Sequence, residues 1–125
     1  MRARKTEYDA VVAVMDKFVE AIHKSDSTIV APYFVESAHL YGNAGGNIEQ
    51  EPISTLLRNI DGLGELGAGV NFRTDILALE ETIAVACMLE ENMGAVSFTN
   101  YFTLMKIGGE WKILIHAYNQ DSDTL

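Results

Sequence analysis

The C-terminal half of the chain most constrains the fold, because four apolar segments follow one another there with very short links. The segments cover residues 72–80, 82–90, 95–107 and 110–120. Their β-branched and aromatic content and the turn residues that bound them predict β-strands. Strands joined by such short links pair as antiparallel neighbours, so this half of the chain predicts a meander.

The N-terminal half has helical periodicity instead. Its first segment repeats apolar residues every three or four positions: Tyr8, Val11, Val12, Met15, Phe18, Val19 and Ile22. We expect a second helix over about residues 28–34, with Pro32 in its first turn or at a kink. A short strand over 38–41, a Gly-rich turn over 42–47 and a return strand over 48–51 follow. A third helix begins at Pro52 and ends near Asp61.

Helices followed by a meander predict one α+β domain over residues 1–125. We expect a curved antiparallel or mixed sheet with the three N-terminal helices on its concave face.

The link between the last two strands fixes how they pair. If Gly108-Gly109 is a two-residue turn, Ile107 faces Glu110, and one face of the pair carries Tyr101 opposite His116. The same register puts Thr103 opposite Leu114 and Thr99 opposite Tyr118. The other face is apolar and carries Phe98, Phe102, Leu104, Trp111, Ile113, Ile115 and Ala117. Since three short helices cover one face of a sheet, we expect a partner subunit on the other.

The charge balance excludes several classes of function. Nine Lys and Arg stand against 18 Asp and Glu, a net charge of -9, which repels nucleic-acid phosphates and anionic membranes. No stretch approaches the ~20 apolar residues of a membrane helix, and acidic residues from Glu7 onward interrupt any secretory signal. The single cysteine, Cys87, allows no internal disulfide and fits the cytoplasm.

Two motifs have no functional context. Residues 62–67 read GLGELG and match a dinucleotide fingerprint, but they follow a predicted helix and precede a strand, the reverse of what pyrophosphate binding needs. Cys87 has no neighbouring base or helix start that stabilises a thiolate. No spacing of Cys, His or acidic residues predicts a metal site, and no cofactor is predicted.

The candidate site residues gather around His116. In the predicted register Tyr101, Tyr118, Thr99 and Thr103 share its face, and such side chains orient a ligand or share a proton. The alternative is a structural histidine bonded to a tyrosine. If His116 lines a cavity, we expect a neutral ring with one free nitrogen. The secondary candidates for ligand binding are Tyr33, His39 and Tyr41. The sequence does not decide which face of the 38–41 strand points inward.

The order of elements resembles the nuclear transport factor 2-like superfamily of cone-shaped α+β domains. Residues 98–106 (FTNYFTLMK), 108–113 (GGEWKI) and 39–42 (HLYG) sharpen the likeness to its putative lumazine-binding, or SnoaL-like, subgroup. The resemblance implies a cavity between helices and sheet, and a homodimer through the convex face with Phe102, Trp111, Ile113 and Ile115. Ketosteroid isomerase shares this fold, but its catalytic acids fall on Gly42 and Thr103 here, so its chemistry does not transfer.

Two functions remain open. One is a domain that binds a small apolar or aromatic molecule, as a weak acid/base enzyme in which His116 moves a proton and Tyr101 and Tyr118 orient the ligand. The alternative is a non-enzymatic, dimeric interaction or regulatory module of the same fold. A cavity of the size usual for ligands, ~300 Å³ or more, favours the first function, and a filled interior favours the second.

Overall fold

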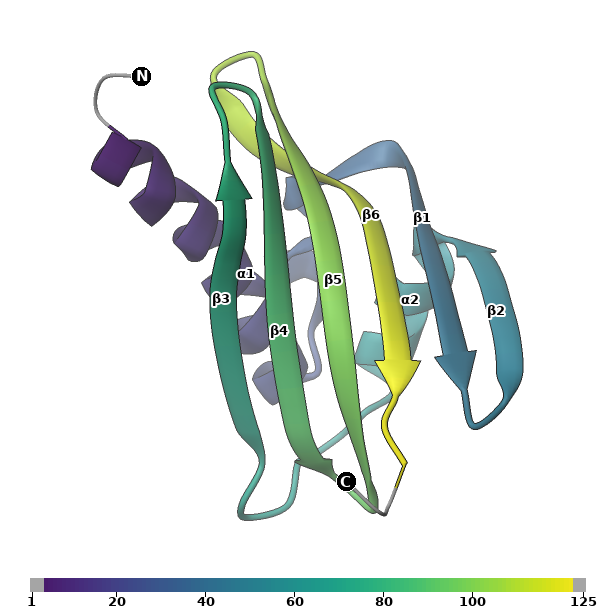
Figure 1. Ribbon diagram of the computed structural model, residues 1–125. Helices are drawn as coiled ribbons and strands as arrows, with labels where there is room; N and C mark the ends of the chain where they lie inside the picture. Colours follow the sequence, from purple (N-terminus) through teal and green to yellow (C-terminus); the bar gives the residue numbers. More distant parts are fainter. Residues whose placement is uncertain (1–3, 123–125) are drawn as a thin grey trace.

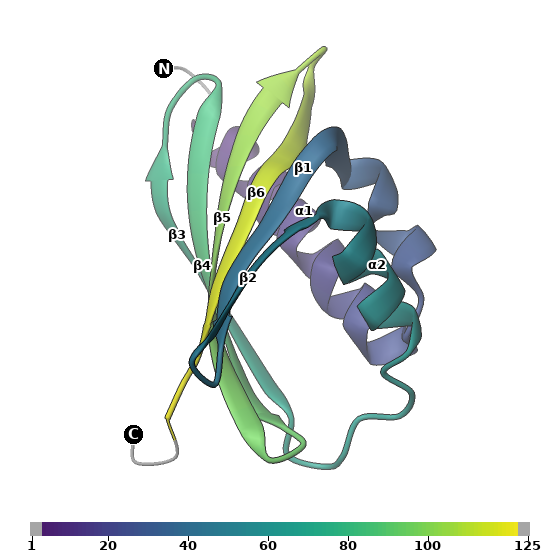
Figure 2. The same cartoon turned by 90° about the vertical axis from the view of Figure 1, so that its right-hand side faces the viewer.

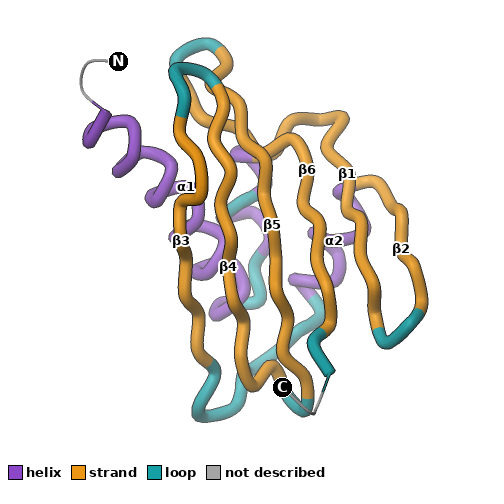
Figure 3. Tube along the Cα trace, viewed as in Figure 1, coloured by secondary structure: helices purple, strands orange, loops and turns teal. Residues whose placement is uncertain are grey.

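The computed structural model describes residues 4–122 of the chain. A long N-terminal helix and a six-stranded sheet form an α+β fold, as predicted (Figure 1, Figure 3). The elements are α1 (Arg4–Lys24), the 3-10 turns η1 (Ser27–Ile29) and η2 (Ala31–Tyr33), β1 (Phe34–Ala44), β2 (Asn47–Pro52), α2 (Ile53–Asp61), β3 (Asn71–Leu79), β4 (Ile83–Met93), β5 (Val96–Ile107) and β6 (Glu110–Gln120).

The helix α1 buries the apolar stripe that its periodicity predicts. Val11, Met15 and Phe18 are fully or almost fully buried against the sheet. The helix ends where Ser25 takes a φ of 51°, a left-handed conformation that stops helical hydrogen bonding. The backbone N–H of Asp26 then bonds back to the carbonyl of Ala21.

The prediction of a second helix over residues 28–34 is wrong in form, since the chain makes two 3-10 turns there. Pro32 has no backbone N–H and lies in η2, where it cannot continue a helical ladder from η1. The Asp61 carboxylate also holds Ser27, accepting from its backbone N–H at 2.7 Å and from its hydroxyl at 3.0 Å. These contacts tie the turns to the end of α2 and direct the chain into β1.

The sheet is mixed, with the strand order β2-β1-β6-β5-β4-β3. Neighbouring strands are antiparallel except β1 and β6, which run parallel. Both α-helices lie on one side of the curved sheet, and Figure 2 shows the opposite side uncovered.

The predicted pairing of β5 with β6 is correct near the turn and wrong beyond it. Ile107 pairs with Glu110 across Gly108-Gly109, and Leu104 still pairs with Ile113 as predicted. A β-bulge follows at Leu114, so that His116 pairs with Phe102 instead of Tyr101. A bulge adds one residue to a strand, and it bends the strand where a sheet curves. Every residue of β6 after the bulge therefore changes face relative to Trp111 and Ile113, so that His116 shares their inward face and Ile115 lies on the outer one.

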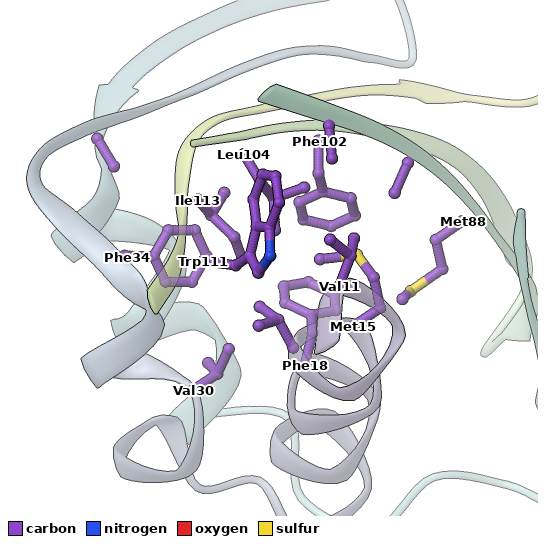
Figure 4. Packing of buried hydrophobic residues seen from close by; sticks show 14 of the residues in the cluster. Val11, Met15, Phe18, Val30, Phe34, Met88, Phe102, Leu104, Trp111 and Ile113 are labelled. Carbon is purple, nitrogen blue, oxygen red and sulfur yellow. The ribbon is translucent and has the colours of Figure 1, made fainter. Parts of the chain in front are cut away.

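Because of the bulge, the predicted dimer face is also wrong. Phe102, Trp111 and Ile113 are buried in the chain's own core, at no more than 3% exposure, and do not form an outer surface. Figure 4 shows these side chains packed with Phe18 and Met15 between sheet and helix. Of the interface residues predicted, Ile115 alone is exposed, at 41%.

Within residues 4–122, no helix is long and apolar enough to span a membrane. The cytoplasmic location stays a prediction.

Candidate functional site

A pocket of about 220 Å³ lies between the helices and the concave face of the sheet. This volume is below the roughly 300–1,000 Å³ of pockets for drug-sized ligands, the size expected of a ligand-binding function. The interior is nevertheless not filled, since liquid water takes about 30 Å³ a molecule, and the pocket has room for a small ligand. Most of its wall is apolar. It is lined by Phe18, Ile22, Leu40, Ala44, Glu49, Leu56, Asn59, Ile60, Leu63, Glu90, Met93, Phe98, Asn100, His116, Tyr118 and Gln120.

A chain of three buried polar side chains crosses the floor of the pocket. Glu90 on β4, Asn100 on β5 and His116 on β6 are 6%, 2% and 3% exposed. The Asn100 amide donates from Nδ2 to Glu90 Oε1 at 2.6 Å, and its Oδ1 lies 2.6 Å from His116 Nε2. Three neighbouring strands thus present one connected network, which holds each of the three side chains in place.

The orientation of the Asn100 amide settles which nitrogen of His116 carries the proton. Asn100 Nδ2 also lies 3.2 Å from the carbonyl oxygen of Met88, which can only accept. Asn100 Oδ1 must therefore face His116, and an oxygen acceptor requires the proton on Nε2. The neutral ring then keeps a lone pair on Nδ1.

His116 Nδ1 has no hydrogen-bond partner among the residues that the structure describes. The ring stacks on Phe102 at 4.4 Å and meets the edge of Phe18 at 5.4 Å, distances between ring centroids. A buried acceptor without a partner costs about 1–3 kcal/mol. One ring nitrogen has no protein partner, as expected, but the Nδ1 atom is itself buried and does not face open space.

Burial shifts the pKa of both ionisable groups in the network. Desolvation raises the pKa of the Glu90 carboxyl to about 7, and the hydrogen bond from Asn100 only partly opposes this rise. Desolvation lowers the pKa of the His116 imidazole to about 3. Near neutral pH the histidine is uncharged, and Glu90 exchanges its proton readily.

A second polar pair closes one side of the pocket. The Tyr118 hydroxyl donates to the Glu49 carboxylate of β2, and burial together with this bond raises the pKa of Tyr118. Gly42 lies between the two residues in β1, paired with both. A Cβ at Gly42 would overlap the Tyr118 ring. The glycine is therefore required for space, so that Tyr118 can lie across β1 and reach Glu49.

The structure brings only two of the predicted site residues into the pocket, His116 and Tyr118. Tyr101 is 47% exposed on the outer face of the sheet, and the side chain of Tyr33 packs against the core. The 38–41 strand turns Leu40 inward, at 1% exposure. The remaining candidates lie on the outer face with Tyr101 and do not line the pocket: Thr99, Thr103, His39 and Tyr41.

Glu90 and Asn100 belong to the site, but no sequence motif singles them out. Glu90 follows Ala84, Ala86 and Met88 at alternate positions of β4, and all four point inward. That alternation is visible in the sequence, but the intervening residues are apolar too, so the pattern alone does not select a face.

A second hollow, of about 400 Å³, is formed by the β4–β5 hairpin and the chain after β6. No helix contributes to it, and its Asp121 carboxylate already accepts from the Thr99 hydroxyl at 3.1 Å. We place the candidate site in the smaller pocket, because the buried ionisable groups lie there. In residues 4–122, no group of three or more His, Cys, Asp or Glu is arranged to hold a metal ion.

Comparison with known proteins agrees with this architecture. A crystal structure of an NTF2-like protein of unknown function from Shewanella baltica OS155 has a TM-score of 0.88 at 26% identity, covering 98% of this chain and 100% of that one. An NTF-2-like protein of unknown function from Silicibacter pomeroyi DSS-3 has a TM-score of 0.84 at 15% identity, over 94% and 98% of the two chains, which speaks for the fold.

Comparison of sequences identifies the family of the chain. Aldolase FrzH from Cladobotryum sp. is 30% identical over 117 residues, which are 90% of this chain and 93% of that protein. Residues 6–119 match the family model described as putative lumazine-binding. The chain therefore belongs to the putative lumazine-binding family, within the nuclear transport factor 2-like superfamily.

Proposed function

We propose that this chain is an acid/base enzyme that moves a proton at a carbon next to a carbonyl group of a small, largely apolar substrate. The observation that carries the proposal is the buried Glu90–Asn100–His116 network on the floor of the pocket. A general base works best when its pKa is close to the working pH. Glu90, with a pKa of about 7, meets that condition better than His116, with a pKa of about 3.

The residues divide the work as follows. Glu90 Oε1 is held by Asn100, while Oε2 makes no hydrogen bond among the described residues and is the oxygen that takes the proton. Its carboxylate breaks the C–H bond and leaves an enolate. The amides of Asn59 and Gln120, also on the pocket wall, are donors for the enolate oxygen. His116, held neutral, positions Asn100 and thereby Glu90.

The aldolase among the relatives favours carbon–carbon bond chemistry as the use of this proton transfer. The enolate carbon bonds to a second carbonyl carbon, whose oxygen becomes an alkoxide and takes the proton back from Glu90. The carboxylate is regenerated, and no electrons enter or leave. An intramolecular reaction suits a pocket of about 220 Å³, since one substrate then carries both carbonyl groups.

Hydrogen exchange tests the proton transfer directly. With cyclohexanone in deuterium oxide, we expect the protein to speed exchange of the α-hydrogens, followed by NMR, and the rate to rise with pH to a plateau above about 7. Glu90→Gln should lower the protein-dependent rate by about a hundredfold, since a positioned base contributes 10²–10⁴. Glu91→Gln is the matched control, because Glu91 is the exposed neighbour on the same strand. Equal rates for the parent and Glu90→Gln, or no exchange above buffer, would refute the proposal.

We also propose a homodimer through the outer face of the sheet, with the face corrected for the bulge. Tyr101 and Ile115 are 47% and 41% exposed there, beside partly exposed Val85, Cys87 and Leu89. An apolar sheet face without a covering layer favours association. The non-enzymatic alternative shares this dimer and differs only in having an inert pocket.

Ile115→Glu should convert the dimer to monomer, because a carboxylate in an apolar interface costs several kcal/mol. Sedimentation velocity measures the outcome. Leu77→Glu is the control, since Leu77 on the edge strand β3 is 57% exposed and lies away from Ile115. A parent that sediments as a monomer, or an Ile115→Glu variant that stays dimeric, would contradict this interface.

A further inference from the structure

The polar groups deep in the pocket share one property, which is that they accept hydrogen bonds. His116 Nδ1 carries a lone pair without a partner, and Glu90 Oε2 makes no hydrogen bond among the described residues. Both side chains are more than nine-tenths buried. A ligand that reaches them must therefore bring hydrogen-bond donors, because a second acceptor placed there would leave both groups unsatisfied.

The charges on the pocket wall have one sign. Glu49 and Glu90 are carboxylates, and in the described part of the chain no Lys or Arg lines the pocket. Glu90 has a single amide donor, from Asn100, and no cation beside it. A buried carboxylate without a counter-ion is costly, and a bound cation relieves that cost. An anion would meet the acidic groups of Glu49 and Glu90, with the neutral amides of Asn59 and Gln120 as donors but no cation to compensate its charge.

The remaining wall fits the body of an organic cation. Phe18 and Phe98 lie on the wall, and the edge of the Phe98 ring meets the Tyr118 ring with centroids 5.7 Å apart. Aromatic faces attract ammonium groups, and aliphatic residues such as Leu40 and Ile60 cover the apolar part of a ligand.

We infer that the pocket selects small apolar amines in their protonated form, with the ammonium N–H groups directed to Glu90 and His116, and rejects carboxylates and phosphates of the same size. This rests on the proposed function in that the same pocket is used, and it adds a class of ligand. An ammonium group bonded to Glu90 occupies the oxygen that takes the proton, so a bound amine competes with proton transfer. The ammonium group occupies the acceptors, and the apolar body of the amine lies against Leu40 and Ile60.

Three probes with the same ring test the inference: benzylammonium, benzyl alcohol and benzoate, each titrated into the protein by calorimetry at neutral pH. We expect benzylammonium to bind about tenfold more tightly than benzyl alcohol, the gain of one charge-assisted hydrogen bond, and benzoate to bind least. Glu90→Gln should weaken benzylammonium about tenfold and leave benzyl alcohol nearly unchanged.

The net charge of -9 attracts any cation, so the control must separate the pocket from the general field. Glu91→Gln removes the same charge one residue away and should leave benzylammonium affinity unchanged. Added salt screens the general field more than a buried pair, so the preference for benzylammonium should persist at raised ionic strength. Glutamine keeps the size of Glu90 without its charge, which preserves folding; Glu49→Gln gives a second variant with a smaller expected loss.

Several results would overturn the inference: benzoate binding as tightly as benzylammonium, equal losses in Glu90→Gln and Glu91→Gln, or no binding of benzylammonium at millimolar concentration. The binding assay needs no turnover, so the two proposals fail separately. Amine selectivity without hydrogen exchange would remove the enzymatic function and keep amines as the ligand class. Hydrogen exchange without amine selectivity would keep the enzymatic function and remove amines as the ligand class.

Discussion

Replacing Phe102 by alanine is expected to lower the free energy of unfolding by about 3–5 kcal/mol, the usual loss for a fully buried phenylalanine. Phe102 is 0% exposed and packs against the edge of Phe18 with centroids 5.0 Å apart. It also stacks on His116, so the variant loses packing on both the helix and the site. Urea denaturation measures the change, with the slope of the transition checked for constancy.

Tyr101→Ala is the control, since it truncates the adjacent aromatic residue on the other face. Tyr101 is 47% exposed, and its loss should cost no more than about 1 kcal/mol at a protein concentration where both variants have the same oligomeric state. The register without a bulge reverses the order, because it turns His116 toward Tyr101. A greater loss for Tyr101→Ala than for Phe102→Ala would therefore show that the faces are assigned wrongly here.

The comparison of these two residues shows how far sequence reasoning reaches. The strands, their antiparallel order and the turn at Gly108-Gly109 could be predicted, because turn residues and apolar alternation are local signals. The bulge at Leu114 could not, since it responds to the curvature of the whole sheet and has no residue signature. A slip of one residue turns every later side chain to the other face. With apolar residues on both faces, nothing in the pattern corrects that error.

The candidate site was hard to predict for the same reason, since its residues depend on the register of the strands. The sequence pattern places His116 beside Tyr101 and Thr103, which lie on the outer face, yet the bulge brings it beside Phe102 and Asn100 instead. Glu90 lies on β4 and Asn100 on β5, which pair with each other. The contact between the two side chains depends on the register of this pair, and no sequence motif reveals that register. Polar residues at inward positions of a strand were the available signal, and it becomes readable only once the inward face is known.

The two buried ionisable groups make opposite contributions to stability as pH changes. The pKa of Glu90 is raised from 4.5 to about 7, so its contribution is favourable at low pH and is lost as pH rises from 4.5 to 7. The pKa of His116 is lowered from 6.5 to about 3, so its contribution is favourable above 6.5 and is lost as pH falls toward 3. Between pH 4.5 and 6.5 the two effects oppose each other.

We therefore expect the free energy of unfolding of the parent to change little between pH 4.5 and 6.5 on account of this pair. Glu90→Gln removes the contribution of the carboxyl group. The free energy of unfolding of this variant, relative to the parent, should rise by about 3 kcal/mol in all as pH increases from 4.5 to 7. His116→Gln removes the contribution of the imidazole. The free energy of unfolding of this variant, relative to the parent, should rise by about 5 kcal/mol in all as pH falls from 6.5 to 3.

Differences between variant and parent are the quantity to measure, because the exposed carboxylates titrate identically in all three proteins and cancel. Urea midpoints collected from pH 3 to 8 give both difference curves. Slopes of opposite sign require that both groups are desolvated in the folded protein, so that Glu90 favours its protonated form and His116 its neutral form. A flat curve for Glu90→Gln would mean that the carboxylate is solvated, which leaves the pocket without its proton carrier. A flat curve for His116→Gln would mean that the ring keeps an ordinary pKa near 6.5, so that below this pH Nδ1 would be a donor instead of the acceptor on which amine recognition depends.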